Sequence, residues 1–123
     1  MFDLDSLNIQ ETSTLEILHP ATGEGTGWVL TLATQAHAGV QTKVSAILDR
    51  TKKRKAPTPA QDEADGLALL TAHVLGWEGL VMNGEGVPYS PEAAAKVLGG
   101  ARSFWIRKQL LEAIGDPTRP FLS

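Results

Sequence analysis

The sequence predicts an α+β domain in which helix predominates, with an N-terminal β-hairpin packed on about four α-helices and a short hairpin-like turn before the last two helices. Three observations predict this fold. Two β-rich segments flank a glycine-rich turn, apolar residues then recur at helical spacing, and Pro and Gly separate these segments. A chain of 123 residues is long enough for one domain with its own core.

The chain is predicted to divide into a flexible arm, residues 1–13, and a single domain, residues 14–123. In the arm, apolar side chains are scattered among polar ones, so no continuous face is available to pack on the domain. The apolar residues of the arm are Phe2, Leu4, Leu7 and Ile9.

The composition excludes several classes of protein. The absence of cysteine excludes disulfides and cysteine-ligated zinc, and it is typical of a reducing compartment. The acidic, polar N-terminus lacks the basic and apolar parts of a signal peptide. No apolar run approaches the roughly 20 residues of a membrane span. We therefore expect a soluble, intracellular protein without a membrane partner.

The first predicted element is a hairpin of two strands, residues 14–18 and 28–32. Both segments are rich in β-favouring residues with partial alternation, and the connecting "HPATGEGTG" holds one proline and three glycines. One face would carry Leu15, Ile17, Trp28, Leu30 and Leu32. Because an isolated hairpin is marginally stable in water, we expect helices to cover that face.

Two helices should follow, separated by prolines. The first is predicted from Ala36 to about Lys55, where basic residues suit the negative end of the helix dipole. Its apolar stripe consists of Val40, Val44, Ile47 and Leu48. Pro57 and Pro59 stop this helix because proline lacks the amide proton that a helix interior needs.

The second helix has a clear start. Thr58 is the predicted N-cap, Pro59 suits the first helical position, and Gln61 completes a capping box. Gly76 is the predicted C-cap. The expected buried face consists of Ala64, Leu67, Leu70, Val74 and Leu75.

The last third begins with a tight reversal. Asn83-Gly84 is a strong hairpin signal between the apolar run 80–82 and the extended residues 87–89. Ser90 then caps a helix predicted over 91–98. A final helix is predicted from about Arg102 to Ile114, because apolar residues recur there at helical spacing.

Residues for catalysis or cofactor binding do not form a recognisable pattern. His19, His37 and His73 lie in three different predicted elements and lack the spacing of metal ligands. "GEGTG" precedes a strand instead of opening a helix, so a hairpin turn is favoured over a phosphate loop. We therefore expect no enzymatic activity, no cofactor and no metal.

One segment concentrates positive charge. Between Lys43 and Lys55, six basic residues accompany one acidic residue, Asp49. Three interpretations stay open: a solvated helix end, a contact with an acidic protein surface, or a nucleic-acid contact. No aromatic residues are interleaved for base stacking, and the net charge of −3 opposes tight nucleic-acid binding.

The segment "LGWEGLVMNGEGVPYSPEAAAKVL", followed by a helix and a phenylalanine near the end, resembles the tail assembly chaperones of siphovirus-like phages. The resemblance covers about residues 74–114, and the N-terminal half agrees in organisation only. The matching positions are Trp77, Gly79, Leu80, Gly84, Gly86, Val87, Pro88, Tyr89, Ser90, Pro91 and Glu92.

This resemblance implies a non-enzymatic role in the host cytoplasm. Such chaperones bind the helical, hydrophobic tape-measure protein and keep it soluble while tail-tube protein polymerises around it, and they are absent from the finished tail. Self-association is also expected, because an exposed apolar stripe tends to become covered. The candidate partner-binding residues are Phe104, Trp105, Ile106, Leu110, Leu111, Lys52, Lys53, Arg54 and Lys55, and the apolar residues of the arm form a further candidate surface.

Two alternative functions remain open from the sequence. The chain could be a structural protein of the tail, such as a completion or tube-associated protein. It could also be a small nucleic-acid-binding regulator that acts through residues 50–55.

Overall fold

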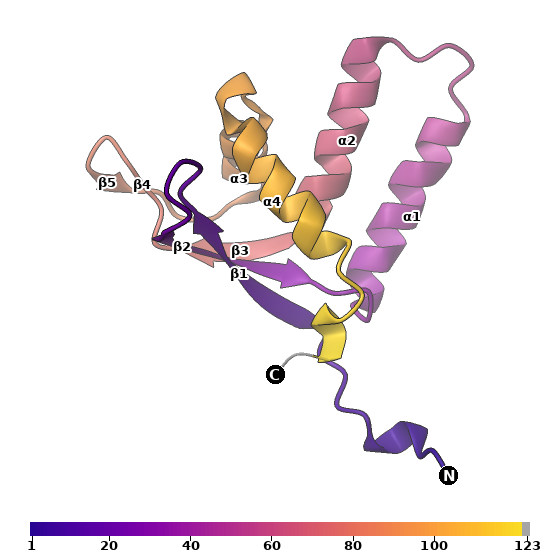
Figure 1. Cartoon of the computed structure of the whole chain (residues 1–123). Helices are drawn as coiled ribbons and strands as arrows, with labels where there is room; N and C mark the ends of the chain where they lie inside the picture. The colour runs from indigo at the N-terminus through magenta and orange to yellow at the C-terminus, as the bar shows by residue number, and fades with distance from the viewer. Residues whose placement is uncertain (122–123) are drawn as a thin grey trace.

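A computed structural model describes residues 1–121 and has the helix-dominant α+β fold that the sequence predicts (Figure 1). The strands are β1 (Thr12–Leu18), β2 (Gly25–Ala33), β3 (Val74–Glu78), β4 (Val81–Met82) and β5 (Glu85–Gly86). The helices are α1 (Ala38–Lys52), α2 (Pro59–His73), α3 (Pro91–Gly99) and α4 (Phe104–Ile114). Single 3-10 turns lie at Leu4–Ser6, Ala101–Ser103 and Arg119–Phe121.

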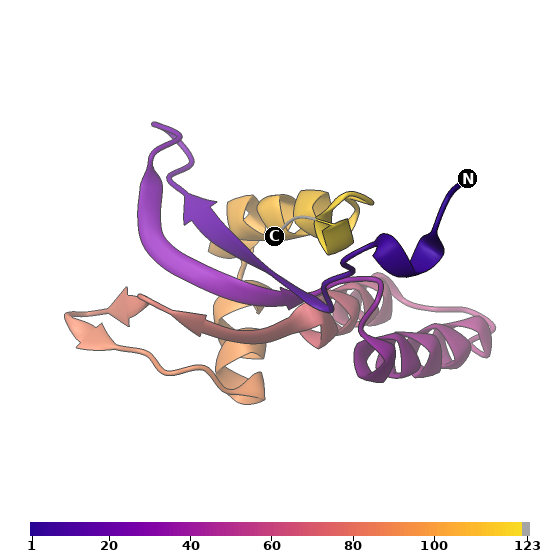
Figure 2. The same ribbon diagram turned by 90° about the horizontal axis from the view of Figure 1, so that it is seen from below.

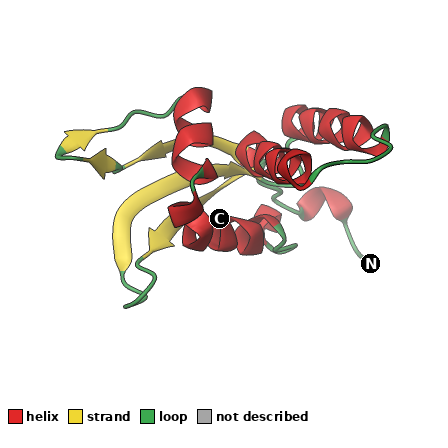
Figure 3. Ribbon diagram, turned by 90° about the horizontal axis from the view of Figure 1, so that it is seen from above, coloured by secondary structure: helices red, strands yellow, loops and turns green. Residues whose placement is uncertain are grey.

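The main sheet has the strand order β1-β2-β3, and both pairings are antiparallel. Leu30 in the central strand lies opposite Leu15 on β1 and Trp77 on β3, so the three side chains share one face. Helices α2, α3 and α4 cover this face, and from above they lie in front of the strands (Figure 3). The buried core consists of Ile17, Trp28, Leu30, Leu32, Leu70, Val74, Ala94, Leu98, Ile106, Leu110 and Ala113.

The opposite face of the sheet is mainly polar. Thr14 pairs with Thr31 and Glu16 with Val29 on this face. From below, β2 and β3 lie in front of the helices (Figure 2). The fold therefore has two layers, one sheet and one set of helices, and the core lies between them.

The predicted end of the second helix was wrong. Helix α2 stops at His73, and residues 74–78 join the sheet as the third strand, with Gly76 opposite Thr31. Val74 already has an extended backbone. Gly76 is therefore a strand residue and not a helix C-cap. The backbone of residues 74–78 pairs with strand β2, which lies far away in the sequence, so the local sequence did not predict the extended conformation.

The predicted buried face of α2 was correct only in part. Leu70 is buried and Leu67 is half-buried, but Ala64 is exposed, and the buried position in that turn is Asp65. The capping box was predicted correctly: the Thr58 hydroxyl accepts from the Gln61 amide, and the Gln61 side chain accepts from the Thr58 amide.

The predicted bounds of the first helix were too wide. The helix begins at Ala38, because the imidazole Nδ1 of His37 accepts a hydrogen bond from the Val40 amide and caps it. It ends at Lys52 instead of Lys55. Helix α1 packs mainly on α2, with which it is antiparallel (Figure 1). Leu48, predicted as part of the apolar stripe, is therefore 41% exposed.

The last two helices lie close to their predicted positions. The capping role of Ser90 is confirmed, since its hydroxyl accepts from the Ala93 amide at 3.0 Å. Arg102 belongs to a 3-10 turn, so α4 begins two residues later than predicted. The guanidinium of Arg107 donates to the carbonyl oxygens of Leu98 at 2.6 Å and Gly100 at 2.7 Å. Helix α4 thereby satisfies the C-terminal carbonyls of α3.

The N-terminal arm joins the domain earlier than the predicted boundary at residue 13. Strand β1 begins at Thr12. Just before it, the Gln10 amide donates to the Pro120 carbonyl, and the Gln10 carbonyl accepts from the Thr34 hydroxyl, both at 2.6 Å. The part of the arm outside these contacts is residues 1–9.

Three aromatic residues connect β3 to the chain that precedes α3. The ring of Trp77 lies edge-to-face against Trp28 at 5.6 Å and against Tyr89 at 5.2 Å. The Trp77 indole donates to the Val87 carbonyl at 2.9 Å, and the Tyr89 hydroxyl donates to the Val74 carbonyl at 2.8 Å. Residues 87–89 are therefore fixed beside the outer strand β3.

Gly79 permits a close backbone approach at the end of the β2–β3 pair. Its φ angle is +81°, and a Cβ atom placed on it would lie 2.1 Å from the carbonyl oxygen of Gly27. Glycine is required at this position both for the backbone angle and for the space.

We predict that Gly79→Ala lowers the free energy of unfolding by at least about 2 kcal/mol, because it adds a positive-φ penalty to a backbone clash. Gly86→Ala is the matched control, since a Cβ at Gly86 would meet nothing within 4 Å. The control should change the free energy of unfolding by less than about 0.5 kcal/mol. Denaturant unfolding measures both variants, and equal effects would contradict the prediction.

We also predict a distinctive titration of Tyr89. Burial, and then the charge of Glu92, raise the pKa of its hydroxyl above 10.0. The unfolded chain forms tyrosinate more readily than the folded chain, so this contribution to stability is complete below about pH 10 and is lost as pH rises through the folded pKa. Tyr89→Phe removes this pH dependence and, with the hydrogen bond to Val74, about 1 kcal/mol at neutral pH.

Tyr89 is the one tyrosine among the 123 residues, so ultraviolet absorbance of tyrosinate reports its ionisation directly. The titration is compared between the native protein and the protein in denaturant. A native pKa equal to or below the denatured value would contradict the prediction.

Candidate partner-binding surface

An open groove lies between the β4–β5 hairpin on one side and helices α3 and α4 on the other. Its volume is about 720 Å³. The large apolar residues of its lining are Trp28, Leu80, Val81, Met82, Val97, Trp105 and Ile106. We call this surface the hairpin groove.

The turn of the small hairpin fixes one wall of the hairpin groove. Asn83 and Gly84 both have positive φ angles, 52° and 79°, which is the conformation of a two-residue hairpin turn. The predicted reversal at Asn83-Gly84 is thus confirmed, although the second strand is residues 85–86 instead of 87–89. The turn leaves Val81 60% exposed and Met82 50% exposed.

The charged residues that line the hairpin groove are both basic, Lys96 from α3 and Arg102 from the turn before α4. Trp28 also lines the groove, and within residues 1–121 its indole nitrogen is buried without a hydrogen-bond acceptor. A surface with apolar walls and a basic rim favours a partner that combines apolar and acidic side chains.

The candidate residues on α4 are divided between the core and the surface. Ile106 and Leu110 are 5% and 0% exposed, because they face the sheet. Phe104 and Leu111 are 67% and 60% exposed. Trp105 is half-buried and reaches the hairpin groove. Leu110 therefore lies below the surface, Ile106 adds a small part of the groove lining, and a partner meets mainly the other three side chains.

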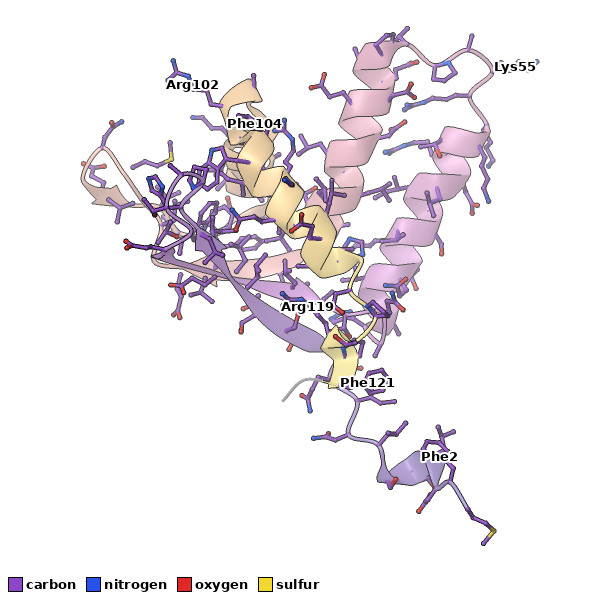
Figure 4. The ribbon with its side chains drawn as sticks, in the orientation of Figure 1. Phe2, Lys55, Arg102, Phe104, Arg119 and Phe121 are labelled. Carbon is purple, nitrogen blue, oxygen red and sulfur yellow. The ribbon has the colours of Figure 1, made fainter. Side chains whose placement is uncertain are left out.

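The basic candidates on the α1–α2 connection lie elsewhere. Figure 4 shows Lys55 on that connection and Phe104 at the start of α4, on different sides of α2. Lys52, Lys53 and Lys55 are exposed. The fourth candidate, Arg54, forms an ion pair with Asp65. The two groups of predicted partner-binding residues do not form one surface.

Asp65 changes the interpretation of this basic segment. Its side chain is 10% exposed and pairs with Arg54, while Arg50 lies 3.7 Å away. The carboxylate thus neutralises part of the charge and joins the end of α1 to the first half of α2. Asp65 thus differs from Asp62 and Glu63 of the same helix, whose side chains are exposed.

The three histidines lie in three different elements, as the sequence predicted, and each has a local environment of its own. The Nδ1 atom of His19 accepts from the amides of Ala21 and Thr22 in the first hairpin turn, and His37 caps α1. His73 is half-buried at the end of α2. In the described part of the chain, no three His, Asp or Glu side chains are grouped as metal ligands. Among residues 1–121, no helix has both the length and the apolar character needed to cross a membrane.

The hairpin groove was not predicted from the sequence. Its lining comes from β2, the small hairpin, α3 and α4, which are separated along the chain. One local signal was present: Val81 and Met82 are apolar but lie next to a polar turn, where little chain is available to bury them.

Comparisons of the chain with protein-family models, with curated proteins and with solved structures return no match.

We predict that Asp65→Asn destabilises the protein by about 1–3 kcal/mol, because Arg54 is then left partly buried without its counter-ion. Asp62→Asn is the control, since Asp62 is exposed in the first turn of α2. The control should cost less than about 0.5 kcal/mol. Thermal or denaturant unfolding compares the two variants, and equal losses would show that the ion pair does not stabilise the helical pair.

Proposed function

We propose that the protein is a phage tail assembly chaperone that binds the tape-measure protein in the host cytoplasm and keeps it soluble while tail-tube protein polymerises. The hairpin groove is the observation that carries this proposal. It is a groove with apolar walls, has a volume of about 720 Å³ and is open to solvent. The resemblance of residues 74–114 to this family adds support.

The chemistry of the groove suits a helical client. An amphipathic helix binds a groove through apolar side chains at helical spacing. Val81 and Met82 supply one apolar wall, and Trp105 supplies part of the other. Methionine is flexible and polarisable, so it adapts to clients of different shape. The exposed side chains of Phe104 and Leu111 extend the apolar area along α4.

A chaperone must also release its client. The groove is open and its rim holds Lys96 and Arg102, so part of the binding energy comes from solvent-exposed charge interactions. Such contacts favour rapid association and moderate affinity. This is the behaviour that temporary protection of a client requires.

The two alternatives make different predictions. A structural tail protein would be present in purified particles, whereas an assembly chaperone would be absent, and mass spectrometry of the particles separates them. A nucleic-acid-binding regulator would rely on residues 50–55, where Asp65 already pairs with Arg54. This ion pair weighs against the regulator.

The direct experiment is co-expression with the tape-measure protein encoded in the same genome. We predict that the native chain increases the soluble fraction of the client and co-purifies with it. The variant Val81→Glu/Met82→Glu should lose most of this effect, because it places two charges on the apolar wall of the groove.

Leu48→Glu is the matched control, since Leu48 is an exposed apolar residue on α1 that does not line the groove. It should protect the client as well as the native chain does. If the native chain neither solubilises the client nor co-purifies with it, the proposed function is wrong. If the groove variant and the control behave alike, the groove is not the client site.

A further inference from the structure

The apolar residues of the N-terminal arm are exposed in the described chain. Phe2, Leu4, Leu7 and Ile9 are 75%, 67%, 38% and 47% exposed. Four such residues within nine positions make a segment that gains free energy when a second surface covers it. A second apolar surface would therefore stabilise the arm.

The arm and the hairpin groove have opposite charges. Asp3 and Asp5 lie between the apolar residues of the arm, and all 11 Lys and Arg residues of the chain lie at or beyond position 43. Lys96 and Arg102 line the groove, and both are basic. An acidic apolar segment and a basic apolar groove are complementary in both respects.

The arm lies far from the groove of its own chain. In Figures 1 and 2 the N-terminus and the β4–β5 hairpin are at opposite ends of the molecule. Figure 4 likewise shows Phe2 at the end of the arm and Arg102 at the other end of the protein. The hydrogen bonds of Gln10 to Pro120 and Thr34 fix the base of the arm at its present end.

We propose that the N-terminal arm, residues 1–9, binds in the hairpin groove of a second copy of the chain. The apolar side chains of the arm contact the apolar walls, and Asp3 and Asp5 pair with the basic rim. Two copies that exchange arms form a closed dimer with two identical arm–groove contacts. This inference does not depend on the proposed function, although an arm in the groove would have to leave before a client enters.

The first test measures self-association of the full chain without any client. Sedimentation velocity over a range of protein concentrations should show the native mass rising from monomer toward dimer. Phe2→Ser/Leu4→Ser should raise the dimer Kd about tenfold or more, since it removes apolar area from the arm only. Leu48→Ser on α1 is the control and should associate like the native chain.

A charge exchange tests the rim. Asp5→Lys and Arg102→Glu should each weaken the dimer, and a protein that carries both substitutions should recover most of the native Kd. The effect should shrink as salt increases. Weakening without recovery would contradict the proposed pairing of the arm with the rim.

Cross-linking identifies the contact itself, because the chain contains no cysteine. Leu4→Cys protein is mixed with Met82→Cys protein under mild oxidation, and a disulfide between two different chains should form. Leu4→Cys mixed with Leu48→Cys protein is the control and should give little product.

Three results would overturn the inference. They are a monomer at every concentration, an unchanged Kd in the arm variant, and equal cross-linking to Met82→Cys and Leu48→Cys. None of these results bears on client binding. Conversely, loss of the client effect in the co-expression experiment leaves the self-association measurement intact, so the two proposals fail separately.

Discussion

The contact of Trp77 with both Trp28 and Tyr89 is the constraint on which the rest of the structure depends. Trp77 lies on the outer strand β3, and its indole holds the Val87 carbonyl while the Tyr89 hydroxyl holds the Val74 carbonyl. The chain that leaves the β4–β5 hairpin is thereby fixed beside β3. Helix α3 then begins beside the sheet, and the hairpin projects as one wall of the hairpin groove. The groove is a consequence of this aromatic contact.

The outer strands of the main sheet also have polar backbone groups covered by side chains. On β1, the Gln109 amide exchanges two hydrogen bonds with Leu18, both at 2.9 Å, and Arg119 donates to the Thr14 carbonyl. On β3, the Tyr89 hydroxyl donates to the Val74 carbonyl in the same way. Covered edges discourage uncontrolled strand pairing between molecules. The surfaces left for partners are apolar side chains in the hairpin groove and along α4, so association would depend on side-chain packing.

The sequence predicted what depends on local chemistry and missed what depends on distant partners. The Asn83-Gly84 turn and the helix start at Ser90 follow from the residues themselves, and both were predicted. Strand β3 was missed because its extended backbone depends on pairing with β2, which lies far away in the sequence. The ion pair of Asp65 was not predicted, because its partner Arg54 lies outside helix α2, on the connection from α1. The apolar residues of α4 were predicted from their helical spacing. Which of them face the sheet depends on packing, so the sequence did not show it. The groove, assembled from four separate parts of the chain, had no complete local signature.

The most direct test of this account is a double-mutant cycle between Trp77 and Tyr89, in which each is replaced by Leu, singly and together, and the free energy of unfolding is measured. If the aromatic contact holds β3 to residues 87–89, the two substitutions should be coupled by about 1 kcal/mol. Effects that add within about 0.3 kcal/mol would show that the two residues act independently. That result would contradict the central role of the contact.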